Sequence, residues 1–260
     1  MSAADVLVPG SPATAEDAAL ARELADATGQ LLLDLRGRTS PGREREYAGD
    51  EQAHDYVTGE LARHRPDDAV LSEEGSLDPT GWRGAHRLWI VDPLDGSSGF
   101  GRGNDEWGVH VALVVDGHLA AGAVSVPGTG ALVDSGTVER VPDHGVPDDG
   151  SLAVTVSRSR PPRELQAVER AFRVNLVKRS AAGVKMLAVL DGEADVYLHS
   201  GGQYEWDNAA PMAVAMAAGL LATRIDGSVV PYGQDDPYSP DLLIARPSVH
   251  AAVLRALRGR

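Results

Sequence analysis

Residues 90–99 read "IVDPLDGSSG", a stretch in which a buried-looking apolar strand ends on two carboxylates, Asp92 and Asp95. A carboxylate beside buried residues is costly unless a cation or a hydrogen-bond donor compensates its charge. Taken alone, the stretch also fits a plain turn, because Asp, Pro and Gly are turn residues. The rest of the sequence has to decide between these two interpretations.

Three further segments place carboxylates at the end of an apolar run or at the start of a helix. They are "AGDE" with Asp50, "LSEEG" with Glu73 and Glu74, and "EWDNAAP" with Asp207. Each has a simpler interpretation: a Glu-Glu pair is commonly a solvated surface, and Asp207 could cap its own helix. Their co-occurrence favours a site for a hard divalent cation such as Mg²⁺, because converging carboxylates repel one another without one.

The turn that follows Asp95 indicates what such a cation would hold. Gly96 lets the backbone come close to a ligand. If a helix starts there, the N–H groups of Gly96, Ser97 and Ser98 form an anion site. Cation ligands beside an anion site suit a metal-bridged phosphate, so the sequence favours phosphoester hydrolysis by a metal-activated water.

Composition excludes several other classes of protein. The 260 residues include no cysteine, which rules out disulfides, thiolate metal sites and a cysteine nucleophile. A net charge of -14 disfavours binding to nucleic acid polymers or to an anionic membrane. We see no signal peptide and no apolar run of membrane-spanning length, so we expect a cytoplasmic protein.

The order of expected elements indicates a layered α/β or α+β architecture. After a mobile leader at 1–13, we expect a helix from Thr14, a charged loop at 36–46 and a second helix from near Asp50. Strands and helices then alternate, including a hairpin that turns at Asp116-Gly117. The Pro- and Gly-rich segment 141–150 predicts a seam between two lobes, 1–150 and 151–260.

Three ordered motifs, "LSEEG", "WIVDPLDGSSGF" and "EWDNAAPMAVAMAAG", resemble the inositol monophosphatase and fructose-1,6-bisphosphatase superfamily. Within it, "DAVLSEE", "VSRSR" and "AAGVKMLAVLDGEADVYLHSGGQYEWDNAAP" look most like CysQ-type 3'(2'),5'-bisphosphate nucleotidases of actinobacteria. The resemblance implies an αβαβα sugar-phosphatase fold with a mixed sheet in each of two lobes. It also implies hydrolysis of 3'-phosphoadenosine 5'-phosphate in sulfate assimilation, two or three Mg²⁺ ions, inhibition by lithium, and homodimers as a common assembly.

The resemblance assigns roles to individual residues. The metal ligands would be Glu73, Asp92, the backbone carbonyl of Leu94, Asp95 and Asp207. The catalytic residues would be Asp50, Glu73 and Ser97, which stands where the family usually has Thr. Glu74 would lie behind the ligands.

The resemblance also implies a set of substrate contacts: Gly96, Ser97, Ser98, Ser157, Arg158, Ser180, Lys185 and Asp207. Arg160 is an alternative to Arg158, and either could instead be solvated. The turn "RSAAGVK" departs from the family's "GSSGxK" around Lys185. Tyr204 or Tyr232 could stack on adenine or belong to the core.

Two alternative functions stay open at this point. One is a phosphatase for inositol-1-phosphate or another sugar phosphate, and the other is a non-catalytic module that binds a phosphorylated metabolite. A serine hydrolase and a P-loop enzyme are disfavoured, because GxSxG and GxxxxGK[ST] are both absent.

Overall fold

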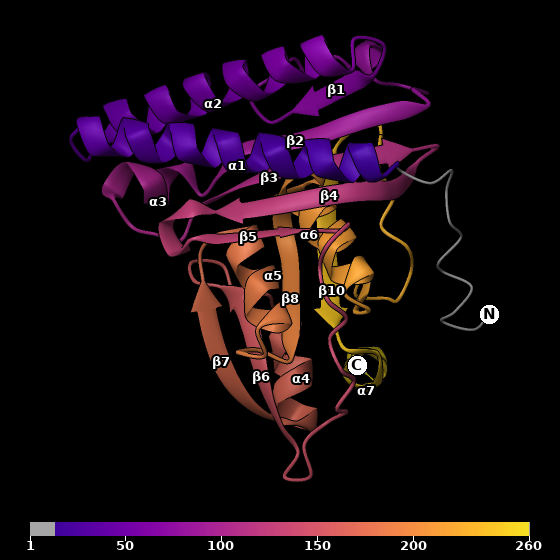
Figure 1. The fold of residues 1–260 in the computed structure, drawn as a ribbon. Helices are drawn as coiled ribbons and strands as arrows, with labels where there is room; N and C mark the ends of the chain where they lie inside the picture. Colours follow the sequence, from indigo (N-terminus) through magenta and orange to yellow (C-terminus); the bar gives the residue numbers. More distant parts are fainter. Residues whose placement is uncertain (1–13, 260) are drawn as a thin grey trace.

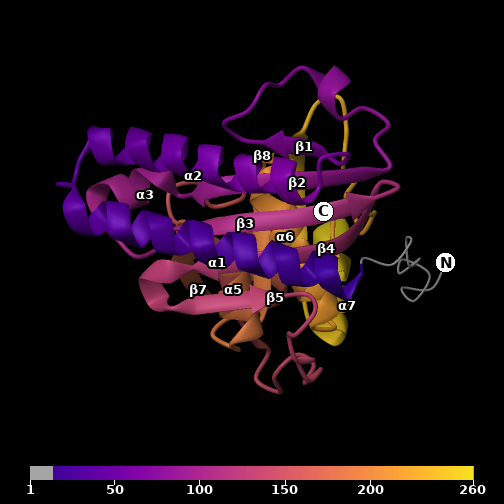
Figure 2. The same ribbon diagram turned by 45° about the horizontal axis from the view of Figure 1, so that its top comes forward.

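Two long helices form one outer layer of the computed structural model, which describes residues 14–259. α1 (Ala15–Arg38) and α2 (Arg43–His64) lie side by side across the first sheet (Figures 1 and 2). α1 begins after Thr14, whose hydroxyl accepts a hydrogen bond from the Asp17 amide and so caps the helix as expected. The predicted leader, residues 1–13, lies outside the described residues.

The prediction of a charged loop over 36–46 is wrong. α1 runs on to Arg38 and α2 already begins at Arg43. Arg45 is buried, and its guanidinium donates to Thr39 and to the Arg36 carbonyl at the end of α1. The second bond satisfies a carbonyl group that the end of α1 leaves free, so Arg45 joins the two helices across their short connection. Asp50 therefore lies within α2 rather than at its start.

The first sheet lies under these helices and is mixed. Its strands pair in the order β1-β2-β3-β4-β5, with β1 parallel to β2 and the other neighbours antiparallel. The strands are β1 (Ala69–Ser72), β2 (Arg87–Asp95), β3 (Gly108–Val115), β4 (His118–Val126) and β5 (Ala131–Asp134). Asp116 and Gly117 both take positive φ, 50° and 79°, which suits the tight hairpin turn predicted there.

β2 carries a bulge near its end that decides where its carboxylates point. Asp92 pairs with His110 and Asp95 with Gly108, so three steps along β2 oppose two along β3. In a regular strand, residues three apart face opposite sides of the sheet. Here Leu94 packs toward α2 beside Gly49, and Asp95 returns to the face that Asp92 occupies. Pro93 lies within the bulge, where a strand tolerates the missing N–H.

The second sheet is also mixed. Its order is β7-β6-β8-β10-β9, with β6 parallel to both neighbours and β10 antiparallel to both of its own. The strands are β6 (Ser151–Ser157), β7 (Arg173–Arg179), β8 (Val196–Tyr204), β9 (Leu221–Thr223) and β10 (Tyr238–Ala245). All five come from the half of the chain after the predicted seam.

The remaining helices complete five layers (Figure 1). α5 (Ala182–Leu190) and α6 (Glu205–Ala217) lie between the two sheets, and α4 (Leu165–Ala171) and α7 (Pro247–Arg258) cover the far face of the second sheet. The short α3 (Ser97–Arg102) follows β2 directly. The αβαβα fold with a mixed sheet in each half is thereby confirmed.

α5 and α6 join the two halves through one shared core. Side chains from both sheets and both helices form a single apolar cluster that includes Ile90, Met186 and Tyr197. The division of the chain at residue 150 therefore stays a prediction. Within residues 14–259, no helix combines the length and the apolar character needed to cross a bilayer.

Candidate metal centre

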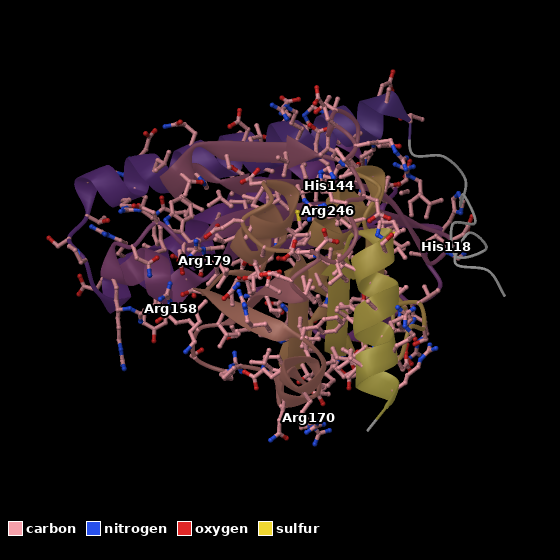
Figure 3. All side chains as sticks on the ribbon, turned by 90° about the horizontal axis from the view of Figure 1, so that it is seen from below. His118, His144, Arg158, Arg170, Arg179 and Arg246 are labelled. Atoms are coloured by element: carbon pink, nitrogen blue, oxygen red, sulfur yellow. The ribbon has the colours of Figure 1, made fainter. Side chains whose placement is uncertain are left out.

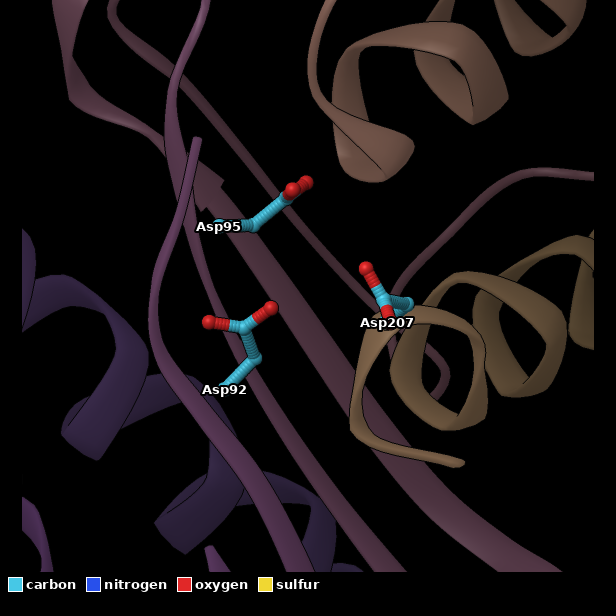
Figure 4. A group of neighbouring side chains, drawn as sticks. All are labelled: Asp92, Asp95 and Asp207. Carbon is cyan, nitrogen blue, oxygen red and sulfur yellow. The ribbon is translucent and has the colours of Figure 1, made fainter. Parts of the chain in front are cut away.

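Three carboxylates from distant parts of the chain converge at the end of β2. One oxygen from each of Asp92, Asp95 and Asp207 lies within 4.8 Å of the others. Figure 4 shows the three side chains pointing toward one another, two from β2 and one from the first turn of α6. Asp92 is 1 % exposed and Asp95 is 7 % exposed. The β2 bulge and the placement of α6 against the same sheet face together create the cluster.

Asp95 is held by the start of α5. The backbone amides of Ala182 and Gly183 donate to its Oδ2 at 2.5 and 3.1 Å. The residue before the helix, Ala181, has no side chain that could cap these amides, so Asp95 acts as the cap from a distant strand. A ligand candidate thus fixes a helix of the second half against the first sheet.

Asp207 has a local contact within its own helix and lies close to the two carboxylates of β2. It is the third residue of α6, and its Oδ2 accepts a hydrogen bond from the Tyr204 amide at 2.7 Å. The simpler interpretation of the sequence, a helix cap, is therefore correct. Asp207 also belongs to the carboxylate cluster, so capping and membership of the cluster do not exclude each other.

Burial and the neighbouring carboxylates raise the pKa values of Asp92 and Asp207. Burial, then the charge of Asp95, raises the pKa of Asp207 to about 8. Burial, followed by the charges of Glu73 and Asp95, raises the pKa of Asp92 well above its ordinary value. Groups that share such a site lose their protons readily only when a cation is present. An oxygen-only set of this kind fits Mg²⁺.

A second group of carboxylates borders the first. Burial and the charges of Glu74, Glu73 and Glu46 raise the pKa of Asp50 to about 7. Burial of its carboxyl and the charges of Asp95 and Glu74 raise the pKa of Glu73 to about 7, although a hydrogen bond with Asp92 opposes this. Much of the surface of Glu73 is nevertheless exposed. The side chain reaches from solvent to the cluster, as a residue at the mouth of a site would.

The turn after Asp95 lies against the start of α5. Gly96 has φ 85° and precedes Ser97, the first residue of α3. A Cβ on Gly96 would lie 3.0 Å from the Glu106 carbonyl and 3.6 Å from the Ala181 side chain, so a glycine is needed for this approach. Ser98 accepts a hydrogen bond from Arg102 at 2.6 Å. Leu94 is buried, and its amide donates to Asp92.

Glu106 ties together several of the expected substrate contacts. It accepts hydrogen bonds from the Arg158 guanidinium at 2.9 and 3.1 Å and from the Ser180 amide at 2.9 Å. Arg179 approaches the same carboxylate at 3.9 Å, and Figure 3 labels Arg158 and Arg179 on one side of the molecule. The sequence analysis missed Glu106, because nothing local marks a partner that lies 52 residues from Arg158.

Lys185 is buried close to the cluster. Its Nζ donates to the Ser180 carbonyl at 2.8 Å and lies 5.4 Å from the centre of the Tyr197 ring. Burial lowers the pKa of Lys185, while the charges of Asp95 and Asp207 raise it. Lys185 thus places an amino group beside the negative cluster.

The other expected contacts lie in different surroundings. Ser157 is buried, and its hydroxyl accepts a hydrogen bond from the Arg160 amide at 3.3 Å. Tyr232 is a core residue that donates to Asn208. Tyr204 is 39 % exposed and stacks on Trp206 with ring centres 4.8 Å apart. Of these two tyrosines, Tyr204 is therefore the one whose ring is accessible.

His110 is a further residue that the sequence analysis did not select. It lies on β3 opposite Asp92 and is fully buried, and burial lowers its pKa although the charge of Asp95 opposes this. The signal for it is a polar residue in the inward-facing position of the apolar run "VHVALVV". That signal is visible only once the strand is paired with "WIVD".

Nearly all of the described chain matches a known protein family. The family model described as "Inositol monophosphatase family" matches residues 15–259. The chain belongs to the inositol monophosphatase family. A family member from Mycobacterium leprae, named 3'-phosphoadenosine 5'-phosphate phosphatase, is 41% identical over 257 residues, which is 93% of each chain. The 3'(2'),5'-bisphosphate nucleotidase CysQ of Escherichia coli K12 is 32% identical over 195 residues, 71% of this chain and 78% of that protein.

Solved structures of the family share the fold. CysQ from Bacteroides thetaiotaomicron superimposes with a TM-score of 0.76 at 26% identity, over 90% of this chain and 98% of that one. Inositol monophosphatase-II from Staphylococcus aureus gives a TM-score of 0.79 at 17% identity, over 93% of each chain. At 17% identity, this second similarity shows a shared fold and says nothing about activity.

Proposed function

We propose that this chain is a Mg²⁺-dependent phosphomonoesterase that hydrolyses 3'-phosphoadenosine 5'-phosphate to AMP and phosphate. The observation that carries the proposal is the convergence of Asp92, Asp95 and Asp207 within 4.8 Å, in surroundings that raise the pKa values of Asp92 and Asp207. The names of relatives at 41% and 43% identity support this choice of substrate.

The residues present suit the proposed cofactor. Asp92, Asp95 and Asp207, together with Glu73 and the Leu94 carbonyl, would hold two or three Mg²⁺ ions. When bound, Mg²⁺ lowers the pKa of a water and neutralises charge on the phosphate oxygens. The ligand set contains only oxygen atoms, which matches the preference of this cation.

The chain's own residues would handle the water and the phosphate. Asp50 and Glu73 border the cluster, and either carboxylate would take up the proton of the attacking water. Ser97 would orient that water or a phosphate oxygen. As the first residue of α3, its N–H has no partner within the helix and would be free to donate to a phosphate oxygen.

The second phosphate of the substrate would meet the segment before α5. Ser180 and Lys185 are joined by a hydrogen bond there, and the Lys185 amino group would donate to the phosphate. Ser157 and Arg158 would complete this end of the site, with Arg158 leaving Glu106 to bind the phosphate. Cytoplasmic localisation, expected from the sequence, and homodimer formation, implied by the family resemblance, remain predictions.

A substrate panel tests the proposal. We expect rapid phosphate release from 3'-phosphoadenosine 5'-phosphate with Mg²⁺, slower release from inositol-1-phosphate and fructose-1,6-bisphosphate, and inhibition by lithium. Release is measured with malachite green, with EDTA in place of Mg²⁺ as the blank. Since Asp95 is a proposed ligand, Asp95→Asn should abolish turnover.

Two results would overturn the assignment in different ways. Fast release from inositol-1-phosphate with little from the nucleotide would make the chain a sugar-phosphate phosphatase. Binding of the nucleotide in the presence of Mg²⁺ with no release from any of the three compounds would make it a binding module.

A further inference from the structure

His110 faces the carboxylate cluster from the neighbouring strand. Its Nε2 lies 3.3 Å from Asp95 Oδ2, and its Nδ1 lies 3.9 Å from Asp92 Oδ2. The ring is fully buried, and within residues 14–259 neither nitrogen meets the distance and angle of a regular hydrogen bond, although a backbone group of Trp206 lies near enough to raise the pKa of the ring. A buried polar group without a well-aligned partner is costly, so the position is unfavourable for stability alone.

Asp95 Oδ2 is surrounded by donors from two elements. The amides of Ala182 and Gly183 reach it from α5, and His110 Nε2 reaches it from β3. An imidazole carries at least one N–H. Among the described residues no donor is found for the other oxygen, Oδ1. Two donated hydrogen bonds and the nearby imidazole thus lie at one oxygen of Asp95 and leave the second oxygen available.

We propose that His110 is a positioning residue: it donates from Nε2 to Asp95 Oδ2 and so holds Asp95 with Oδ1 toward the bound cation. The inference rests on the proposed cation site and deepens it. Residues that hydrogen-bond to a metal ligand orient it, and their loss weakens metal binding without removing a ligand.

Gly183 supplies an independent observation. A Cβ on this residue would lie 2.6 Å from His110 Nε2 and 2.8 Å from the Val124 side chain. The backbone of α5 therefore comes to Asp95 only because Gly183 leaves room for the ring. Helix propensity alone disfavours the glycine in "RSAAGVK", since Gly weakens a helix relative to Ala. The room that Gly183 leaves for the His110 ring explains its presence there. Ring, glycine and carboxylate fit together as one unit.

The experiment compares two replacements of similar length. His110→Gln keeps an amide N–H close to the position of Nε2, whereas His110→Met fills the same space without a donor. The affinity of each purified protein for Mn²⁺ is measured by titration calorimetry without substrate, together with its melting temperature. His250→Met, at a buried histidine that bonds to Thr223 within the second half, is the matched control.

We expect His110→Met to bind Mn²⁺ about 10- to 100-fold more weakly, and His110→Gln to stay within about threefold of wild type. His250→Met should lower the melting temperature and leave Mn²⁺ affinity unchanged. The inference is overturned if Met and Gln at position 110 give equal Mn²⁺ affinities, because a ring that only fills space would not distinguish them. If His110→Met does not fold, a wild-type affinity of His110→Gln supports the inference and a tenfold loss overturns it. Since no substrate is present, failure of the nucleotide assay leaves this result standing.

Discussion

At the scale of single residues, the fold brings together carboxylates whose negative charges repel one another. Asp92 shows this most clearly, because it is buried and has acidic neighbours on several sides. Without a cation the protonated form relieves the repulsion. The residue therefore contributes to the cation site and opposes stability in its absence.

Asp92→Asn separates these two effects. Asn resembles the protonated carboxyl, so we expect the melting temperature without metal to stay the same or rise. Mn²⁺ affinity and phosphate release should fall more than about 100-fold, beyond the loss typical of an outer hydrogen-bond partner. Asp55→Asn, at an exposed position of α2, is the control and should change none of the three quantities. A large fall in melting temperature with normal Mn²⁺ affinity would contradict the assignment.

At the scale of elements, the close approach of α6 to the first sheet brings Asp207 into the cluster. Gly122 on β4 makes this approach possible. A Cβ there would lie 2.7 Å from the Ala213 side chain and 3.1 Å from the Ala210 carbonyl. Backbone atoms cannot move aside as a flexible side chain can, so a larger residue must displace the helix.

Gly122→Ala should therefore affect both stability and the site. We expect a loss of about 1–3 kcal/mol in the free energy of unfolding, as in other overpacked cores. Mn²⁺ affinity should fall as well, because displacement of α6 carries Asp207 away from Asp92. Gly59→Ala in α2, where a Cβ would meet nothing within 4 Å, should add up to about 1 kcal/mol and leave affinity unchanged. Urea unfolding and calorimetry measure the two quantities, and an unchanged affinity in Gly122→Ala would argue against the mechanism.

The same scale shows how far the sequence alone could lead. The motifs around Asp92, Asp95 and Asp207 predict a common site, since each pairs a carboxylate with an apolar lead-in. The bulge that turns Asp95 to the correct face depends on pairing with β3, and no local pattern reveals it. Short strands such as β9 and remote partners such as Glu106 cannot be predicted from local sequence for the same reason, because their contacts are distant in sequence.

At the scale of the whole molecule, the raised pKa values link stability to pH and to metal. Asp50 and Asp207 ionise near pH 4 when unfolded, but near 7 and 8 in the fold. A carboxyl whose pKa is raised by folding favours the native state most at low pH, and this contribution is lost as pH rises through the folded pKa.

We therefore expect the melting temperature without metal to fall between pH 5 and about 8.5. Added Mg²⁺ should raise it by an amount that grows over the same range, because the cation competes with protons for the carboxylates. Differential scanning calorimetry with EDTA or with Mg²⁺ measures both trends. Asp207→Asn should show a weaker pH dependence, and a Mg²⁺ effect that is equal at pH 5 and pH 8.5 would contradict this account.

The bulge in β2 has a consequence for how this protein can change. A regular ladder through the same residues, without the bulge, would suit strand pairing alone better. Such a ladder would turn Asp95 toward α1 and α2 and away from its partners on α5, because residues three apart then face opposite sides of the sheet. The irregular pairing is thus under functional constraint here as much as residue identity is. Engineering for stability should exchange side chains around this strand and keep its irregular spacing.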